Sequence, residues 1–228
     1  MAEIKGSDLP AATSIIGTDI VIGVESSASK SITAEKILMT QSLTAADVRW
    51  KSNRVSPLSS KVGGSRDPDF AKFSDDGSGS QGVFLYHFDD TTEEELYVDV
   101  QANPDYKEDT AFYIQIWWIP KSNGGVGEKV SWGVEFNIAE PGGVFGNTTL
   151  FYSNIPLPNG DLIANRLYYT EIAIPAFTVS VGASSAARIF RDATGAGEID
   201  DYTDDAMLIS VEVKYEIDAL GSSTRTVK

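Results

Sequence analysis

The sequence predicts an all-β protein, a jelly-roll-like two-sheet sandwich of about eight strands preceded by an extended N-terminal arm. Short apolar segments recur from residue 83 to residue 217, separated by turn-forming Gly, Pro and Asn. Several of these segments alternate apolar with polar residues, and no helical period of useful length follows residue 80. No internal repeat is evident, which argues against a solenoid or a propeller.

Eight segments are predicted as strands, and typical turn sequences separate them, such as Asn103-Pro104, Gly124-Gly125 and Pro158-Asn-Gly160. The last segment alternates well, because Ile209, Val211, Val213, Tyr215 and Ile217 fall on one face of a strand. The predicted strands are 83–88, 96–102, 111–120, 129–139, 148–153, 167–175, 187–192 and 207–217.

We expect segments 111–120 and 129–139 to form a hairpin at the centre of the fold, joined by the glycine-rich loop 121–128. The second segment alternates, with its apolar face made of Val130, Trp132, Val134, Phe136 and Ile138. The first segment is apolar at almost every position, which is typical of a strand covered on both faces.

The chain divides by composition into three parts. In residues 1–40, short apolar clusters are spaced by Gly, Pro, Ser and Thr, and such a stretch cannot build a core alone. We interpret it as an arm that orders on its own domain, on sister copies or on a larger assembly; the alternative is a frayed terminus. Residues 41–80 are predicted as a connector, with a helix start at Thr44 and apolar anchors at Trp50 and Val55. Residues 81–228 form the predicted β-sandwich domain.

The charge and composition exclude several functions. The formal net charge is −15, and no Lys/Arg cluster offsets it, so we expect no binding to nucleic acid or to anionic membrane surfaces. The chain has no cysteine, which rules out disulfides, thiol catalysis and cysteine-based metal sites. The first twelve residues lack an apolar signal segment, and no apolar run approaches the roughly 20 residues that span a bilayer. We therefore expect a protein made in a cytoplasm, without membrane insertion.

Polar clusters give no strong indication of catalysis. The acidic segment 198–205 has oxygen ligands that suit Ca²⁺, but it lacks EF-hand spacing, and an acidic surface loop is the favoured interpretation. His87 is the only histidine, it sits in a predicted strand, and no Gly-x-Ser-x-Gly sequence accompanies it. The glycine-rich loops link strands rather than a strand and a helix, so they are predicted as turns and not phosphate cradles. We expect no catalytic residue, metal or cofactor.

Two further groups of residues leave alternatives open. Trp117, Trp118 and Trp132 are predicted to pack in the core or at a subunit contact; the alternative is a sugar-stacking platform, with or without a carboxylate pair for cleavage. Arg188 and Arg191 are predicted to pair with nearby acids in structural ion pairs. The candidate partners are Asp192, Asp200 and Asp201.

The opening sequence Ile4-Lys-Gly-Ser-Asp-Leu-Pro, followed by Gly17-Thr-Asp-Ile-Val-Ile-Gly-Val, resembles a segment common at the N-termini of tailed-bacteriophage virion proteins. Downstream, Trp50-Lys-Ser-Asn-Arg-Val, Val130-Ser-Trp-Gly-Val-Glu-Phe and Arg188-Ile-Phe-Arg-Asp are similar to phage and prophage structural proteins. Gln115 and Trp117 stand where such relatives tend to carry histidines, so no histidine-based metal site is inferred.

The resemblance implies a non-enzymatic virion structural protein, made in the host cytoplasm and built as a homotrimer that contacts capsid or tail components. A capsid decoration or head-fibre protein is the leading hypothesis. The alternatives are a tail-fibre or receptor-binding protein, or a carbohydrate-binding module that uses surface aromatics on a host glycan. The expected docking residues are Ile4, Leu9, Ile15, Ile16, Ile20 and Ile22. The expected subunit-contact residues, which need cover from a neighbouring subunit, the second sheet or a folded-back 41–80, are Tyr113, Trp117, Tyr168 and Tyr169.

Overall fold

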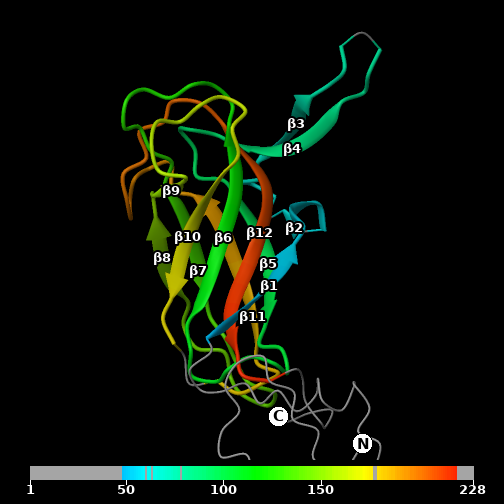
Figure 1. The fold of residues 1–228 in the computed structure, drawn as a ribbon, viewed down its shortest axis with the longest axis vertical. Coiled ribbons are helices and arrows are strands. Elements are labelled where there is room, and N and C mark those ends of the chain that lie inside the picture. Colours follow the sequence, from blue (N-terminus) through cyan, green and yellow to red (C-terminus); the bar gives the residue numbers. More distant parts are fainter. Residues whose placement is uncertain (1–47, 60, 63, 78, 177–178, 220–228) are drawn as a thin grey trace, which may run out of the picture. The chain divides into compact units, whose positions relative to one another are not determined.

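Twelve strands in the described residues build two antiparallel sheets that pack face to face (Figure 1). The computed structural model describes residues 48–219 except 60, 63, 78, 177 and 178. The chain divides into two units, Met1–Thr44 and Ala45–Lys228, and every described residue belongs to the second. The docking residues, the arm and the helix start predicted at Thr44 all lie outside the described residues.

The larger sheet has seven strands and the smaller sheet has five. In the larger sheet the order is β3 (Asp69–Ser74), β4 (Val83–Phe88), β12 (Ala206–Ile217), β6 (Phe112–Pro120), β10 (Tyr168–Ile174) and β9 (Pro156–Leu157), and β1 (Arg49–Val55) also pairs with β12. In the smaller sheet the order is β2 (Lys61–Val62), β5 (Glu95–Gln101), β11 (Ser184–Arg191), β7 (Trp132–Phe136) and β8 (Thr149–Ser153). A single 3-10 turn, η2 (Pro57–Ser59), is the only helical element described, and no described helix is long and apolar enough to cross a membrane.

The structure confirms the predicted all-β, two-sheet sandwich. From β4 to β7 the chain alternates between the two sheets, and it does so again from β10 to β12, as in a jelly roll. Each of the eight predicted strands overlaps an observed strand, and 83–88 is reproduced residue for residue. Four strands were not predicted, and three of them (β1, β2 and β3) fall in the range interpreted as a connector. Most residues of β1 are polar and exposed, and β3 does not alternate strictly, so neither shows the alternation by which a strand is recognised.

The predicted hairpin 111–139 is wrong, because β6 and β7 belong to different sheets. β6 pairs with β12 and β10, whereas β7 pairs with β11 and β8. The two strands instead face each other across the core, where Trp118 and Trp132 lie 6.3 Å apart between ring centroids. Strands that both carry large apolar faces bury more surface by packing face to face than by pairing edge to edge.

The core between the sheets is rich in aromatic side chains, as its sequence indicates. The predicted inward face of β7 is buried, and Trp118 of β6 stacks on Tyr168 with ring centroids 5.6 Å apart. Fully burying side chains of this size contributes on the order of 2–3 kcal/mol each before conformational entropy is counted. The largest fully buried aromatic residues are Trp118, Trp132, Tyr106, Tyr168, Tyr215, Phe88, Phe112, Phe136 and Phe190.

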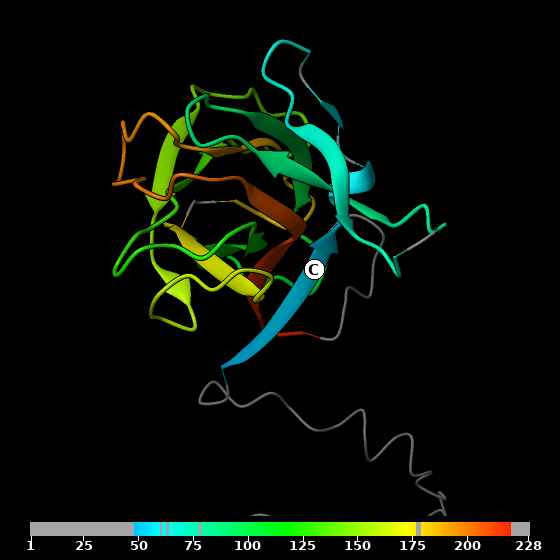
Figure 2. The ribbon, with the colours of Figure 1, turned by 90° about the horizontal axis from the view of Figure 1, so that it is seen from above.

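Strand β12 organises the larger sheet. One of its edges pairs with β6 over most of its length, while the other pairs first with β4 and then with β1. Past β12, the β3–β4 hairpin extends away from the sandwich (Figures 1 and 2). Strand β1 therefore adds a seventh strand beside β12, and it brings Trp50 alongside the outer face of the sheet.

Candidate functional site

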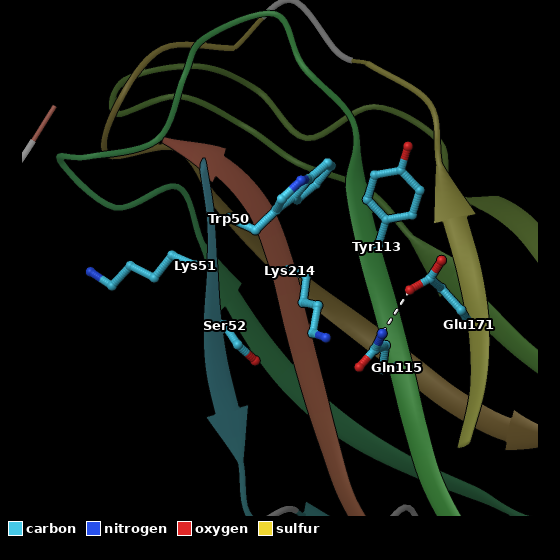
Figure 3. Close-up of a pocket in the computed structure, with 7 residues that line it drawn as sticks. All are labelled: Trp50, Lys51, Ser52, Tyr113, Gln115, Glu171 and Lys214. Carbon is cyan, nitrogen blue, oxygen red and sulfur yellow. Dashed lines mark hydrogen bonds between the residues drawn. The ribbon is translucent and has the colours of Figure 1, made fainter. Parts of the chain in front are cut away.

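The outer face of the larger sheet contains a hollow of about 590 Å³ (Figure 3). It lies over β1, β12, β6 and β10, on the side of the sheet that does not face the core. Because successive strand residues point to opposite faces, alternate residues of these four strands supply most of its lining. The lining residues are Trp50, Lys51, Ser52, Tyr113, Gln115, Glu171 and Lys214.

The antiparallel register places the polar lining residues in two rows across the sheet. Ser52 lies opposite Lys214, and Lys214 lies opposite Tyr113. In the next row Gln115 lies opposite Glu171. Direct cross-strand neighbours have Cβ atoms roughly 5 Å apart, so side chains from four strands reach one another although they are distant in sequence.

Two aromatic rings form one end of the hollow. The Trp50 ring packs edge-on against Tyr113, with centroids 5.3 Å apart and an interplanar angle of 77°. Trp50 remains 49% exposed even though it touches Tyr113, and its ring stands over the hollow in Figure 3. A tryptophan this exposed presents a large flat apolar surface to solvent.

The floor of the hollow carries the buried side-chain amide of Gln115, which is only half satisfied within the described part of the chain. Gln115 is only 3% exposed, and its Nε2 donates a hydrogen bond to Glu171 Oε2 at 2.7 Å. A carboxylate only accepts, so this bond fixes which end of the amide faces Glu171. The other end, Gln115 Oε1, is buried and has no hydrogen-bond partner among the described residues. A buried acceptor left unpaired costs about 1–3 kcal/mol, which a hydroxyl donor from a ligand would recover.

The two lysines that line the hollow differ in whether their ammonium groups are already engaged within the protein. Lys51 bonds to Asp105, and this hydrogen bond raises the pKa of Lys51; its side chain points away from the other lining residues in Figure 3. Lys214 lies within the hollow, and its ammonium has no hydrogen-bond or ion-pair partner in the described part of the chain. Counting the described residues alone, the hollow therefore combines flat aromatic surface with one cation, one carboxylate and one amide oxygen that lack a fully satisfying partner set: Lys214 and Gln115 Oε1 have none, and Glu171 bonds to Gln115.

The structure separates the four residues predicted as subunit contacts. Tyr113, Trp117 and Tyr169 share the outer face, and Tyr113 lines the hollow. Tyr168 instead lies in the core at 1% exposure, so it cannot contact another subunit. Consecutive strand residues alternate between faces, and for that reason Tyr168 and Tyr169 could not both point outward. Subunit contact through the other three residues stays a prediction.

The structure confirms the predicted core packing for two of the three tryptophans and removes those two from the alternative, a sugar-stacking platform. Trp118 and Trp132 are fully buried in the core, whereas Trp117 lies on the outer face. The exposed stacking surface comes from Trp50, which the sequence indicated only as a local apolar anchor. The signal that could have identified it is the strand pattern of 49–55, which becomes meaningful only once β1 is known to pair with β12.

The acidic segment 198–205 has structural roles. Asp200 forms a two-bonded ion pair with Arg191, confirming one of the expected pairings. Asp201 accepts a hydrogen bond from the backbone N–H of Lys129, and Asp205 pairs with Lys121. Among the described residues, no group of three or more acidic or histidine side chains is placed to hold a metal ion.

Arg188 and His87 also have structural partners. Burial disfavours the charged Arg188 guanidinium, but the hydrogen bonds that it donates to Glu93, Glu95 and Glu135 outweigh this effect and raise its pKa. His87 is buried, with its Nδ1 3.4 Å from Asp205 Oδ2. Neither residue lines the hollow.

Comparison with known proteins yields structural similarity only. No known protein family matches the sequence, and no curated protein matches it. Among solved structures, the enzymatically active domain of bacteriophage CBA120 tailspike protein 4 is 8% identical with a TM-score of 0.33, covering 74% of this chain and 19% of that chain. TmCBM61 in complex with β-1,4-galactotriose is 11% identical with a TM-score of 0.31, covering 72% and 86%. The CBM22-1–GH10 modules of a Clostridium thermocellum xylanase are 8% identical with a TM-score of 0.26, covering 77% and 27%. Overlaps this low carry no information on function.

Proposed function

We propose that the unit Ala45–Lys228 is a non-catalytic carbohydrate-binding module whose binding site is the hollow on the larger sheet. The observation that carries this proposal is the exposed Trp50 ring beside Tyr113, over a floor with the unpaired acceptor Gln115 Oε1. A binding site that combines aromatic surface with a few fixed polar groups suits a ligand with both apolar and hydrogen-bonding faces.

A saccharide has this combination of faces. The C–H face of a sugar ring packs against an aromatic ring, while its hydroxyls both donate and accept hydrogen bonds. In this hollow Gln115 Oε1 and the Glu171 carboxylate would accept from hydroxyls, and Lys214 would donate to them. The net charge of −15 disfavours a polyanionic ligand, so we infer a neutral glycan.

The same geometry supports binding rather than cleavage. Hydrolysis of a glycosidic bond ordinarily uses two carboxyl groups on either side of that bond. Of the described residues that line the hollow, only Glu171 is a carboxylate, and it is hydrogen-bonded to Gln115. The nearby Glu212 accepts a hydrogen bond from Ser52 and does not line the hollow. A non-enzymatic role is therefore part of the proposal.

Placement on a virion is the second part of the proposal, and it depends on the resemblance of the N-terminal sequence to phage virion proteins. Within that hypothesis a glycan-binding hollow favours the tail-fibre or receptor-binding alternative over capsid decoration. The homotrimer, the docking role of residues 1–40 and the contacts with capsid or tail components remain proposals. Mass measurement by light scattering tests the trimer, and a monodisperse monomer would contradict it.

The binding proposal is tested on a glycan array that includes neutral oligosaccharides and bacterial surface polysaccharides, followed by calorimetric titration of any ligand found. We expect Trp50→Ala to weaken binding at least tenfold, because it removes the exposed ring. Phe145→Ala is the matched control, since Phe145 is 51% exposed and does not line the hollow. Absence of binding to every glycan, or equal loss in both variants, would contradict the proposal.

A further inference from the structure

The outer face of the larger sheet continues beyond the hollow with a second aromatic pair. Trp117 and Tyr169 lie directly opposite each other on β6 and β10. Their ring centroids are 4.8 Å apart with an interplanar angle of 33°, and both side chains are partly exposed. They stand one row further along the strands than Gln115 and Glu171. The first and last of these three rows therefore carry aromatic residues, Tyr113 at one end and the Trp117–Tyr169 pair at the other.

The polar row between the two aromatic pairs is continuous with the hollow. Gln115 lies two residues from Tyr113 and two from Trp117, so all three point to the same face of β6. Glu171 lies two residues from Tyr169 on β10 in the same way. A ligand that leaves the Trp50–Tyr113 end along β6 must pass over Gln115 and Glu171 before it reaches Trp117.

Unpaired hydrogen-bonding atoms mark the same path. Gln115 Oε1 and Trp117 Nε1 are both buried and both lack a partner among the described residues. One is an acceptor and the other a donor. Buried polar atoms are ordinarily paired with protein or ordered water, so these two neighbouring positions of one strand face leave an acceptor and a donor that a polar ligand would satisfy.

The distance between the two aromatic pairs sets the minimum length of a ligand that contacts both. Tyr113 and Trp117 are four residues apart on one strand, which corresponds to about 13 Å at the rise of an antiparallel strand. A single sugar ring is about as wide as an aromatic ring, so it cannot reach both pairs. We propose that the sheet binds a linear neutral glycan of several sugar residues along β6, with the Trp117–Tyr169 pair as a second aromatic subsite. This inference rests on the proposed carbohydrate-binding function and defines the form of its ligand.

Titration of the full chain with cello-oligosaccharides and manno-oligosaccharides of one to six residues tests this inference, because both series form extended neutral chains. We expect affinity to rise with chain length until the ligand spans both aromatic pairs. Trp117→Ala should weaken binding of the longer oligomers about tenfold and leave the mono- and disaccharides unchanged. Trp50→Ala should weaken binding at every length. Trp117→Phe keeps a ring at this position and should retain most of the length dependence.

The failures of the two proposals are distinguishable. Binding that does not depend on length, or that Trp117→Ala weakens equally at all lengths, overturns the second subsite while leaving the hollow as a binding site. No binding of any oligomer in either series, with none on the array, overturns the carbohydrate-binding function itself. A Trp117→Ala variant that changes the molecular mass in light scattering and leaves glycan affinity unchanged assigns this pair to a subunit contact instead. Thermal unfolding of each variant verifies that it is folded.

Discussion

The ion pair between Arg191 and Asp200 provides the most direct test of what holds the sandwich together. Arg191 Nε and Nη2 donate to the two carboxylate oxygens of Asp200 at 2.9 and 2.8 Å. The arginine side chain is fully buried and the aspartate side chain is 2% exposed. Arg191 also donates to the backbone carbonyls of Phe88, Tyr202 and Asp204, so it joins the end of β4 to the segment that leads into β12.

Replacing Asp200 with asparagine removes the negative charge and leaves a buried guanidinium without its counter-ion. Loss of one partner of a buried pair ordinarily costs about 3–5 kcal/mol. We expect the lower end, about 3 kcal/mol, because burial raises the pKa of Asp200 in spite of Arg191. The raised pKa means that the cost of desolvating the Asp200 carboxylate offsets part of its attraction to Arg191.

The same substitution one residue later is the matched control. Asp201 is exposed, and its carboxylate accepts a hydrogen bond from the Lys129 backbone N–H, which an asparagine oxygen would still accept. We expect Asp201→Asn to lower the free energy of unfolding by less than about 1 kcal/mol. Urea denaturation at neutral pH measures both variants against the wild type. If Asp200→Asn is no more destabilised than Asp201→Asn, the buried ion pair does not stabilise the sandwich as proposed.

Three further predictions concern pH, packing and the hollow. Burial is the main cause that raises the pKa of Glu94 from an ordinary 4.5 to about 7. Between pH 4.5 and 7 the Glu94 carboxyl is ionised in the unfolded chain but still protonated in the folded protein. The free energy of unfolding of the wild type therefore falls as pH rises through this range, by about 1–2 kcal/mol after allowance for the partial exposure of Glu94. Glu94→Gln should abolish that part of the slope in denaturation curves at pH 4.5 to 7.5; an unchanged slope would contradict it. Gly133→Ala would place a methyl group 2.1 Å from the Phe190 ring and should cost about 1–3 kcal/mol in thermal unfolding. The control Gly146→Ala meets no heavy atom within 4 Å, and equal loss in both would refute the steric argument. Gln115→Leu removes the unpaired acceptor, so we expect stability within about 1 kcal/mol of the wild type but weaker glycan binding; undiminished binding would remove Gln115 from the site.

Residue patterns predicted the strands whose two faces differ in polarity or whose residues are all apolar. In β7, alternation from Trp132 to Phe136 identified both the strand and its buried face. In β6 the nearly continuous apolar run predicted the strand, but the expected cover on both faces is incomplete, because Tyr113 and Trp117 on the outer face stay partly exposed. These patterns are local, so they can be recognised in a segment without knowing which strand it pairs with.

Strand partners could not be predicted in the same way. The β6–β7 hairpin was inferred from proximity in sequence, yet the loop between them crosses from one sheet to the other. Strand β1 was missed because most of its residues are exposed. It is held as a strand by pairing with β12 at seven positions, and its own residue pattern does not show this. The site was missed with it, since Trp50 joins Tyr113 only through that pairing.

Local residue patterns were enough to predict a β-sandwich with an aromatic core, because most of the predicted strands show period-two alternation or a continuous apolar run. The sequence also predicted that Arg191 would pair with a nearby acid. Which aromatic rings are buried and which are exposed became clear from the folded chain: Trp118 and Trp132 meet across the core, while Trp50, Tyr113, Trp117 and Tyr169 share the outer face. The physical reason is that cross-strand register, which brings residues from β1, β6, β10 and β12 together, depends on long-range pairing that no local pattern encodes.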